Sequence, residues 1–189
     1  MNIYLSSQER NFKSYLNFLK HRKIIPYDKS KLKRKESEIH IESNSDIKNL
    51  NLNFFYNYNI FPKNIMAFLT EWRVENRNMR VGDTIVQQIH VPPSELFSIK
   101  LICGVRIREI ISEPNRQGFS YETLMGHTER GISTFTFEHQ DNTILFRIQT
   151  FSEPSSLLTR LTRFIADGYQ AFCTNQALLS VKNSCSSLT

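Results

Sequence analysis

The sequence lacks the features that mark secreted, membrane-spanning and metal-binding proteins. Its 189 residues include only three cysteines, Cys103, Cys173 and Cys185, so neither a disulfide framework nor a zinc site is predicted. No apolar run is long enough to span a bilayer, and no apolar segment of a secretory signal is visible near the N-terminus. These absences favour a soluble protein of the reducing cytoplasm.

Recognisable catalytic patterns are missing as well. The sequence contains no HExxH or CxxC pattern and no Ser-His-Asp arrangement that would indicate an enzyme. It also has no internal repeat and no long tract of low complexity. We therefore predict neither a metal nor a cofactor.

The chain is basic, with a net charge of +6, and much of the excess precedes residue 40. Eight positive residues cluster over 20–35: Lys20, Arg22, Lys23, Lys29, Lys31, Lys33, Arg34 and Lys35. Such a run is typical of a solvated, partly mobile arm. The alternative is a contact with nucleic acid or an anionic membrane, although few aromatics are interleaved for base stacking. We predict a basic segment over 1–49, a folded domain over 50–182 and a tail over 183–189.

Hydrophobic spacing outlines the first elements. Residues 1–23 carry a rough helical stripe, whereas residues 27–49 lack a period and are interpreted as a linker with a short strand at 39–41. Residues 50–61, LNLNFFYNYNIF, alternate as a strand does. Residues 62–72 start with a proline and have apolar side chains at spacings of three and four, which predicts a helix.

From residue 84 the period changes to two, which indicates strands. Apolar residues alternate along 85–91, up to Pro92 and Pro93, and then along 101–111, 119–125, 135–137 and 144–148. Short turns separate these runs, so the sequence predicts a meander of antiparallel strands. Arg106 and Arg108 fall on the polar side of their strand, which is interpreted as solvated.

Residues 156–180 return to helical spacing after Pro154. The stripe consists of Leu157, Leu161, Phe164, Ile165, Tyr169, Phe172, Gln176 and Leu179. A stripe this wide must pack on something large and apolar, and the inner face of the sheet is the only candidate of sufficient size. We predict an α+β fold of helix-grip type, in which a curved antiparallel sheet wraps the C-terminal helix and leaves an internal cavity.

Residues 118–131, GFSYETLMGHTERG, form the most patterned stretch of the chain. They resemble the signature of an uncharacterised family, domain of unknown function 1990, also called uncharacterised protein family 0548. The matching residues are Gly118, Phe119, Tyr121, Thr123, Leu124, Gly126, His127, Glu129 and Gly131, then Phe151, Ser152 and Pro154, with Trp72 upstream. The resemblance covers about residues 50–182.

The resemblance implies a fold like that of the Bet v 1/START-like lipid-binding superfamily, and it implies no established activity. The family usually has two acidic residues after the last glycine of this motif, where this chain has Ile132 and Ser133. An acidic role at those two positions is therefore not expected here.

His127 and Glu129 are the weak catalytic candidates. A histidine titrates near neutral pH and can pass a proton, and a nearby carboxylate can orient its ring. Gly126 and Gly131 bracket the pair, as a chain reversal requires. Local hydrogen bonding within a turn is therefore the competing interpretation.

A ligand site is predicted in the cavity beneath the C-terminal helix. Its expected residues are Trp72, Phe119, Tyr121, Thr123, Phe146 and Tyr169. Tyr121 and Thr123 would place hydroxyls in an otherwise apolar pocket, as small-molecule sites usually do. The alternative is that both belong to a packed core. Cys103 is expected to be buried and inert.

The predicted function is that of a soluble protein that binds a small apolar or amphipathic ligand. One alternative is an enzyme of the same fold that uses His127 and Glu129 as acid and base. The other is an interaction protein that docks through its basic N-terminal segment.

Overall fold

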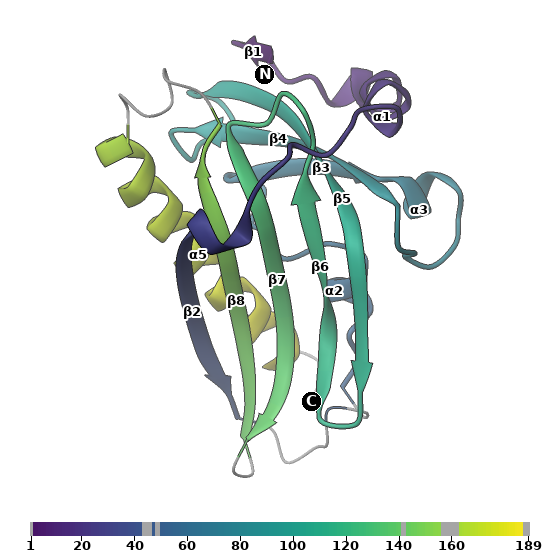
Figure 1. The fold of residues 1–189 in the computed structure, drawn as a ribbon, viewed down its shortest axis with the longest axis vertical. Helices are drawn as coiled ribbons and strands as arrows, with labels where there is room; N and C mark the ends of the chain where they lie inside the picture. Colours follow the sequence, from purple (N-terminus) through teal and green to yellow (C-terminus); the bar gives the residue numbers. More distant parts are fainter. Residues whose placement is uncertain (1, 43–46, 48–49, 141–142, 156–162, 187–189) are drawn as a thin grey trace.

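The computed structural model describes residues 2–42, 47, 50–140, 143–155 and 163–186, with side chains of the last range described from residue 168 onward. It is an α+β protein built around one large, curved antiparallel sheet (Figure 1). The strands are β1 (Asn2–Tyr4), β2 (Lys33–Ile41), β3 (Met66–Thr70), β4 (Thr84–Val91), β5 (Ile99–Glu113), β6 (Arg116–Thr123), β7 (Glu129–Gln140) and β8 (Thr143–Pro154). The helices are η1 (Glu9–Asn11), α1 (Phe12–Lys20), η2 (Lys29–Lys31), α2 (Asn53–Tyr56), α3 (Glu71–Val74) and α5 (Arg163–Ser186).

The sheet is a meander with one strand added at its edge. Its order is β2-β8-β7-β6-β5-β4-β3, and β1 pairs with the start of β5. The strands predicted from residue 84 onward are confirmed, and each pairs antiparallel with the next. Their alternation is clear because one face of each strand packs into an apolar core.

The largest difference from the sequence prediction is β2. Residues 33–41 were interpreted mostly as linker, but they pair with β8 along nine residues. Only Ile39 and Ile41, opposite Phe146 and Ile144, show the apolar alternation of a strand. The rest of β2 is charged on both faces, as edge strands commonly are, so no hydrophobic period marks it.

The segment before β3 is also different from the prediction. Residues 50–61 do not form a strand: they form α2 and a turn that contains Tyr58 at φ +64°. Four of these residues become buried, Leu52, Phe55, Tyr58 and Ile60, and the first three are three apart. This helical spacing was hidden within the alternating pattern.

The helix predicted over residues 62–72 is wrong for most of its length. The Pro62 carbonyl accepts hydrogen bonds from Ile65 and Met66 in a turn, and β3 then pairs with β4. Only α3 is helical, and the Thr70 side chain caps it by accepting from the Arg73 N–H at 3.3 Å. Pairing with β4 overrides the local helical spacing.

The outer face of the sheet, opposite α2 and α5, is covered by the N-terminal residues. The helix predicted over residues 1–23 is confined to α1 and the short η1. Phe12, Leu16 and Leu19 of α1 pack on Val86 and Ile102. Residues 24–32, here called the strap, then cross the outer face of β6, β7 and β8 before β2 begins, with α5 on the opposite side (Figure 1).

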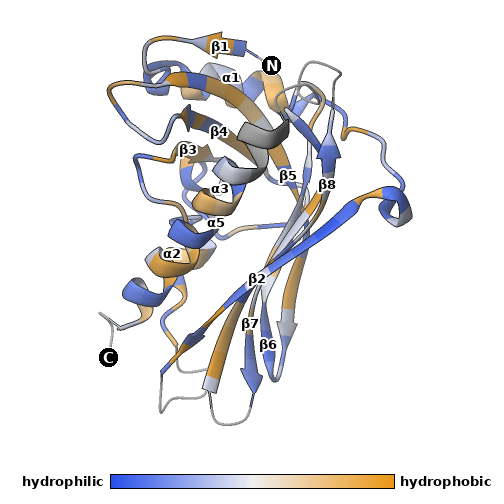
Figure 2. Ribbon diagram, turned by 90° about the vertical axis from the view of Figure 1, so that its left-hand side faces the viewer, coloured by the Kyte–Doolittle hydropathy of each residue, from blue (hydrophilic) through white to orange (hydrophobic). Residues whose placement is uncertain are grey.

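The inner face packs against α2 and α5, and its apolar residues form the main core (Figure 2). The buried residues of α5 are Cys173, Ala177, Leu178, Val181 and Cys185. Phe172 and Leu179, which were assigned to the packing stripe, are exposed. Small residues at a spacing of four bring the helix close to β2 and β8. The predicted start at 156–162 lies outside the described residues.

Within the part of the chain that the structure describes, no helix is both long and apolar enough to cross a membrane.

Candidate functional site

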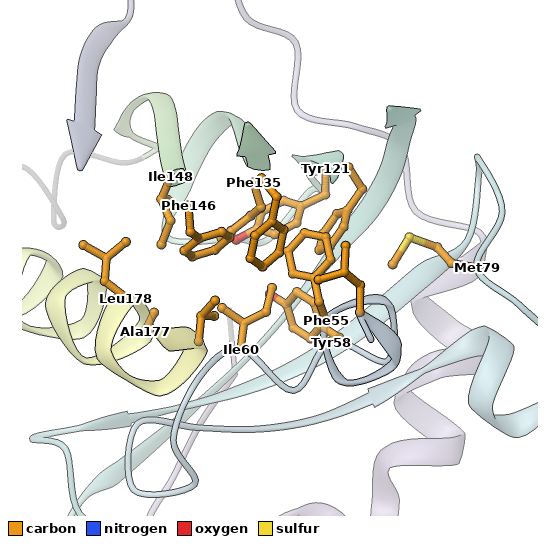
Figure 3. Close-up of a cluster of buried hydrophobic side chains, with 14 of the residues drawn as sticks. Phe55, Tyr58, Ile60, Met79, Tyr121, Phe135, Phe146, Ile148, Ala177 and Leu178 are labelled. Carbon is orange, nitrogen blue, oxygen red and sulfur yellow. The ribbon is translucent and has the colours of Figure 1, made fainter. Parts of the chain in front are cut away.

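Phe119 and Phe146, predicted to line a ligand cavity, are completely buried in the main core. Figure 3 shows Phe146 there beside Ile148 and Phe135. The ring of Phe55 from α2 packs on both, with centroids 4.9 Å from Phe119 and 5.9 Å from Phe146. Phe135 stacks on Phe119 at 5.4 Å, and Phe137 lies 4.8 Å from Phe146. The side chains of the protein itself therefore fill this part of the inner face.

Tyr121 belongs to a polar cluster inside this aromatic core. Gln87 Nε2 donates to the Tyr58 hydroxyl at 2.7 Å, and Cys103 Sγ donates to Gln87 Oε1 at 3.6 Å. The ring of Tyr121 lies beside that of Tyr58, with centroids 6.2 Å apart, and its hydroxyl faces Tyr58, Ser133 and Gln87. Burial raises the pKa of both tyrosines, so both phenols keep their protons and can donate.

Next to the polar cluster, the core is less well covered. Phe61, Phe68, Ile89 and Tyr169 pack against the core but are only partly buried, and we call this region the open end. It adjoins the cluster because the Phe68 ring lies 5.1 Å from that of Tyr58. The Tyr169 hydroxyl donates to the His90 carbonyl, which ties α5 to β4 here.

The other two predicted ligand residues support the fold. Trp72 of α3 is 1% exposed and lies in the main core. Thr123 Oγ1 accepts from the Gly131 N–H at 3.0 Å and lies 3.4 Å from the Gly131 carbonyl oxygen. These contacts join the ends of β6 and β7, so the hydroxyl of Thr123 is already hydrogen-bonded.

His127 lies in the turn between β6 and β7. Gly126 has φ +98°, a backbone conformation that favours glycine and fits the predicted chain reversal. The His127 Nδ1 lies 3.0 Å from the Glu129 N–H and from the Glu129 carbonyl oxygen. Burial lowers the pKa of His127 to about 4, so the ring is neutral at pH 7. These contacts fit the local-turn interpretation.

The Glu129 carboxylate points away from this ring contact and toward α5. Its Oε2 accepts from Gln170 Nε2 at 3.3 Å, and Gln170 Oε1 accepts from Lys35 Nζ. Gln170 therefore joins α5 both to the turn and to β2. Glu129 anchors the helix through this contact, and no hydrogen bond links its carboxylate to the His127 ring within the described part of the chain.

The basic N-terminal segment is not a free arm where the structure describes it. Lys20 pairs with Glu71 at 2.8 Å and with Glu75 at 3.1 Å. The Arg34 guanidinium pairs with Glu36 at 2.5 Å. Because these charges have partners and β2 is paired, the solvated-arm interpretation is wrong for residues 33–41.

Sequence reasoning missed Tyr58 and Gln87 as members of the site. Tyr58 was missed because residues 50–61 were predicted to form a strand. The position of Gln87 could have been recognised from the sequence, because it lies at an inward position between Ile85 and Ile89 on an alternating strand. A polar side chain at such a position needs buried partners, so it points to a polar cluster.

No group of three or more histidine, cysteine, aspartate or glutamate residues is placed to hold a metal ion in the described ranges. Burial raises the pKa of Cys103 to about 12, so its thiol is not a nucleophile at neutral pH. The prediction that Cys103 is buried is confirmed.

A family model described as Domain of unknown function (DUF1990) matches residues 57–179. This chain belongs to the DUF1990 family. The match includes the whole motif at residues 118–131, on which the resemblance rested. None of the curated proteins matches the chain.

Solved structures share the DUF1990 fold of this chain. A protein from Arthrobacter aurescens is 11% identical, with a TM-score of 0.52 over 84% of this chain and 90% of its own. A Mycobacterium smegmatis protein is 10% identical, with a TM-score of 0.51 over 89% of this chain and 99% of its own. At these identities the likeness shows the fold alone.

Proposed function

We propose that this DUF1990 protein binds a small apolar or amphipathic molecule at the open end, between the sheet and α5. The observation that carries the proposal is the polar cluster of Tyr58, Gln87 and Tyr121 beside aromatic side chains that are only partly buried. Sites for small molecules combine an apolar lining with a few convergent polar groups in this way.

The packing of the inner face limits the size of the ligand. Phe55 and its aromatic neighbours occupy the region beneath α2, so the ligand is confined to the open end near Phe68 and Tyr169. Its polar group would receive a hydrogen bond from the Tyr121 hydroxyl, and its apolar part would contact Phe68 and Ile89. We assign the fold to the helix-grip type of START-like proteins, in which a cavity between sheet and helix holds the ligand.

We also propose that the protein acts in the cytoplasm. Cys103, Cys173 and Cys185 are free and buried, which suits a reducing compartment.

Native mass spectrometry of the purified protein tests the proposal. We expect the folded protein to carry an added mass that disappears on denaturation. Analysis of an extract of the protein should then identify the ligand. Tyr121→Phe should reduce affinity for this ligand at least tenfold, which corresponds to about 1.4 kcal/mol. Tyr15→Phe is the matched control, since it removes a hydroxyl that bonds Tyr4 at 2.6 Å, away from the inner face.

Two results would contradict the proposal. One is a protein that carries no added mass after expression in several hosts and binds no member of a lipid and metabolite mixture. The other is equal ligand affinity in the Tyr121→Phe and Tyr15→Phe proteins.

A further inference from the structure

A cleft of about 530 Å³ lies on the outer face of the sheet where the strap crosses it. Its lining includes Tyr27 and Lys29 of the strap, with Arg108 and Ile111 of β5. Clefts of roughly 300–1,000 Å³ suit small molecules. The cleft is on the face opposite to α5, so it is separate from the open end and an argument about it stands independently of the proposed function.

An irregularity in β5 brings Arg108, Glu109 and Ile111 together on the lining of this cleft. The pairing of β5 with β6 shifts register between Ile107 and Glu109, and such bulges re-aim side chains. Arg108 Nη1 donates to Glu122 Oε1 at 2.6 Å and to the Tyr27 hydroxyl at 3.1 Å. Its other guanidinium nitrogens make no hydrogen bond to any residue that the structure describes, so they remain able to donate.

The buried carboxylate of the cleft is already compensated. Glu122 is 12% exposed, and its Oε1 accepts from the Tyr27 hydroxyl at 2.5 Å as well as from Arg108. Burial and the bond to Glu122 raise the pKa of Tyr27 to about 12, so its phenol keeps the proton that it donates. Glu109 is the second carboxylate, and it is exposed at the rim.

Lys29 supplies a second cation. Its Nζ lies 4.3 Å from the centroid of the Phe151 ring, and no carboxylate pairs with it in the described ranges. A cation–π contact at an exposed site is weak, so an anion can compete for this ammonium group. Between the cations, Ile111 and Ile132 give the cleft an apolar wall.

We propose that this cleft binds a free small amphipathic anion. Arg108 and Lys29 hold its carboxylate, sulfonate or phosphate group, and Ile111 and Ile132 contact its apolar body. The lining has three basic and two acidic residues; Arg116 is paired with Glu138 at 3.2 Å, which leaves Arg108 and Lys29 as the cations that can meet an anion.

Binding of 8-anilinonaphthalene-1-sulfonate, followed by fluorescence, tests this site. We expect saturable binding that the double change Lys29→Gln with Arg108→Gln weakens at least tenfold. Lys31→Gln is the matched control, because Lys31 is on the same strap with 79% of its side chain exposed and is paired with Asp28. It should change affinity less than twofold. N-phenyl-1-naphthylamine, which has the same rings without the sulfonate, should bind this cleft at least tenfold more weakly.

Amide chemical shifts of the isotope-labelled protein locate the binding site. On addition of the sulfonate, the shifts of Tyr27 and of Arg108 to Ile111 should change. Lys29→Gln alone repeats the test if the double variant does not fold. The proposal is overturned if the charge variants and the control bind equally, or if shifts occur only around Tyr121 and Ile89. It is also overturned if the charge changes abolish sedimentation with phosphatidylglycerol vesicles but leave affinity for the soluble sulfonate unchanged.

Discussion

Replacing Phe55 by alanine should remove a large part of the stability of this protein. The side chain is completely buried, and its ring lies 4.9 Å from Phe119, 5.0 Å from Phe137 and 5.9 Å from Phe146. These partners belong to three strands that are hydrogen-bonded to one another, so they cannot move in to close the space left by the ring. Changes of phenylalanine to alanine in such cores cost about 3–5 kcal/mol, and we expect about 4 kcal/mol here.

Urea unfolding followed by tryptophan fluorescence measures this loss. Trp72 is the single tryptophan of the sequence and is 1% exposed, so its emission shifts to longer wavelength on unfolding. Phe97→Ala is the matched control: it removes the same atoms at a site that is 82% exposed, and it should change the free energy of unfolding by less than about 0.5 kcal/mol. A loss below about 1 kcal/mol for Phe55→Ala, with an unchanged urea dependence, would refute the placement of α2 on the inner face.

Four further outcomes are expected. The folded pKa of His127 is about 4 against an ordinary 6.5, so stability falls as pH drops from 6.5 to 4. In thermal melts, the stability of the His127→Ala protein should depend less on pH, and at pH 7 its free energy of unfolding should be lower by about 1 kcal/mol. A variant whose stability depends on pH as strongly as that of the parent protein would contradict this prediction. Gly126→Val should lower the free energy of unfolding by about 1–3 kcal/mol, because a side chain opposes φ +98° at this position. Gly168→Ala lies in a helix with nothing within 4 Å of the new methyl group, so it should raise the free energy of unfolding by about 0.5–1 kcal/mol. Equal effects of the two changes would contradict the argument from backbone conformation. Trypsin should spare Lys33–Ile41 despite its basic residues, since β2 is paired with β8, and early cleavage there would show that the pairing is wrong. A chain that ends at Pro154 should be insoluble because the loss of α5 uncovers the inner face, so a soluble product with a cooperative melt would argue against this packing.

The strands that sequence reasoning predicted correctly are those whose two faces differ most. Along β6, Phe119 and Tyr121 alternate with the polar residues Ser120 and Glu122, because the aromatic side chains face the core. The same logic failed for β2, where most side chains are polar on both faces. It also failed for β3, whose apolar spacing looks helical until β4 supplies the partner for its backbone. Long-range pairing decides both cases, and no local pattern records it.

In the candidate sites too, local alternation predicts some residues, whereas residues that depend on long-range pairing are missed. The inward direction of Tyr121 followed from the alternation of β6, but its partners Tyr58 and Gln87 come from elements far apart in sequence. The cleft on the outer face could not be predicted, because it depends on a register shift in β5 and on the path of the strap. A register shift leaves no simple trace in the order of apolar and polar residues.

The pairing of β2 with β8 has a consequence for how the molecule assembles. Arg147 reaches Glu38 across 109 positions of chain, and Gln149 reaches Glu36 across 113. During synthesis from the N-terminus, β2 emerges long before the strand that it must join. Contacts this distant in sequence form slowly, since a long loop has to close first. The alternating lysines, arginine and glutamates of β2 keep it hydrated and unattractive to other strand edges in that interval. A polypeptide that begins at residue 50 would lack this closing strand altogether and would leave the backbone of β8 open to its neighbours in solution.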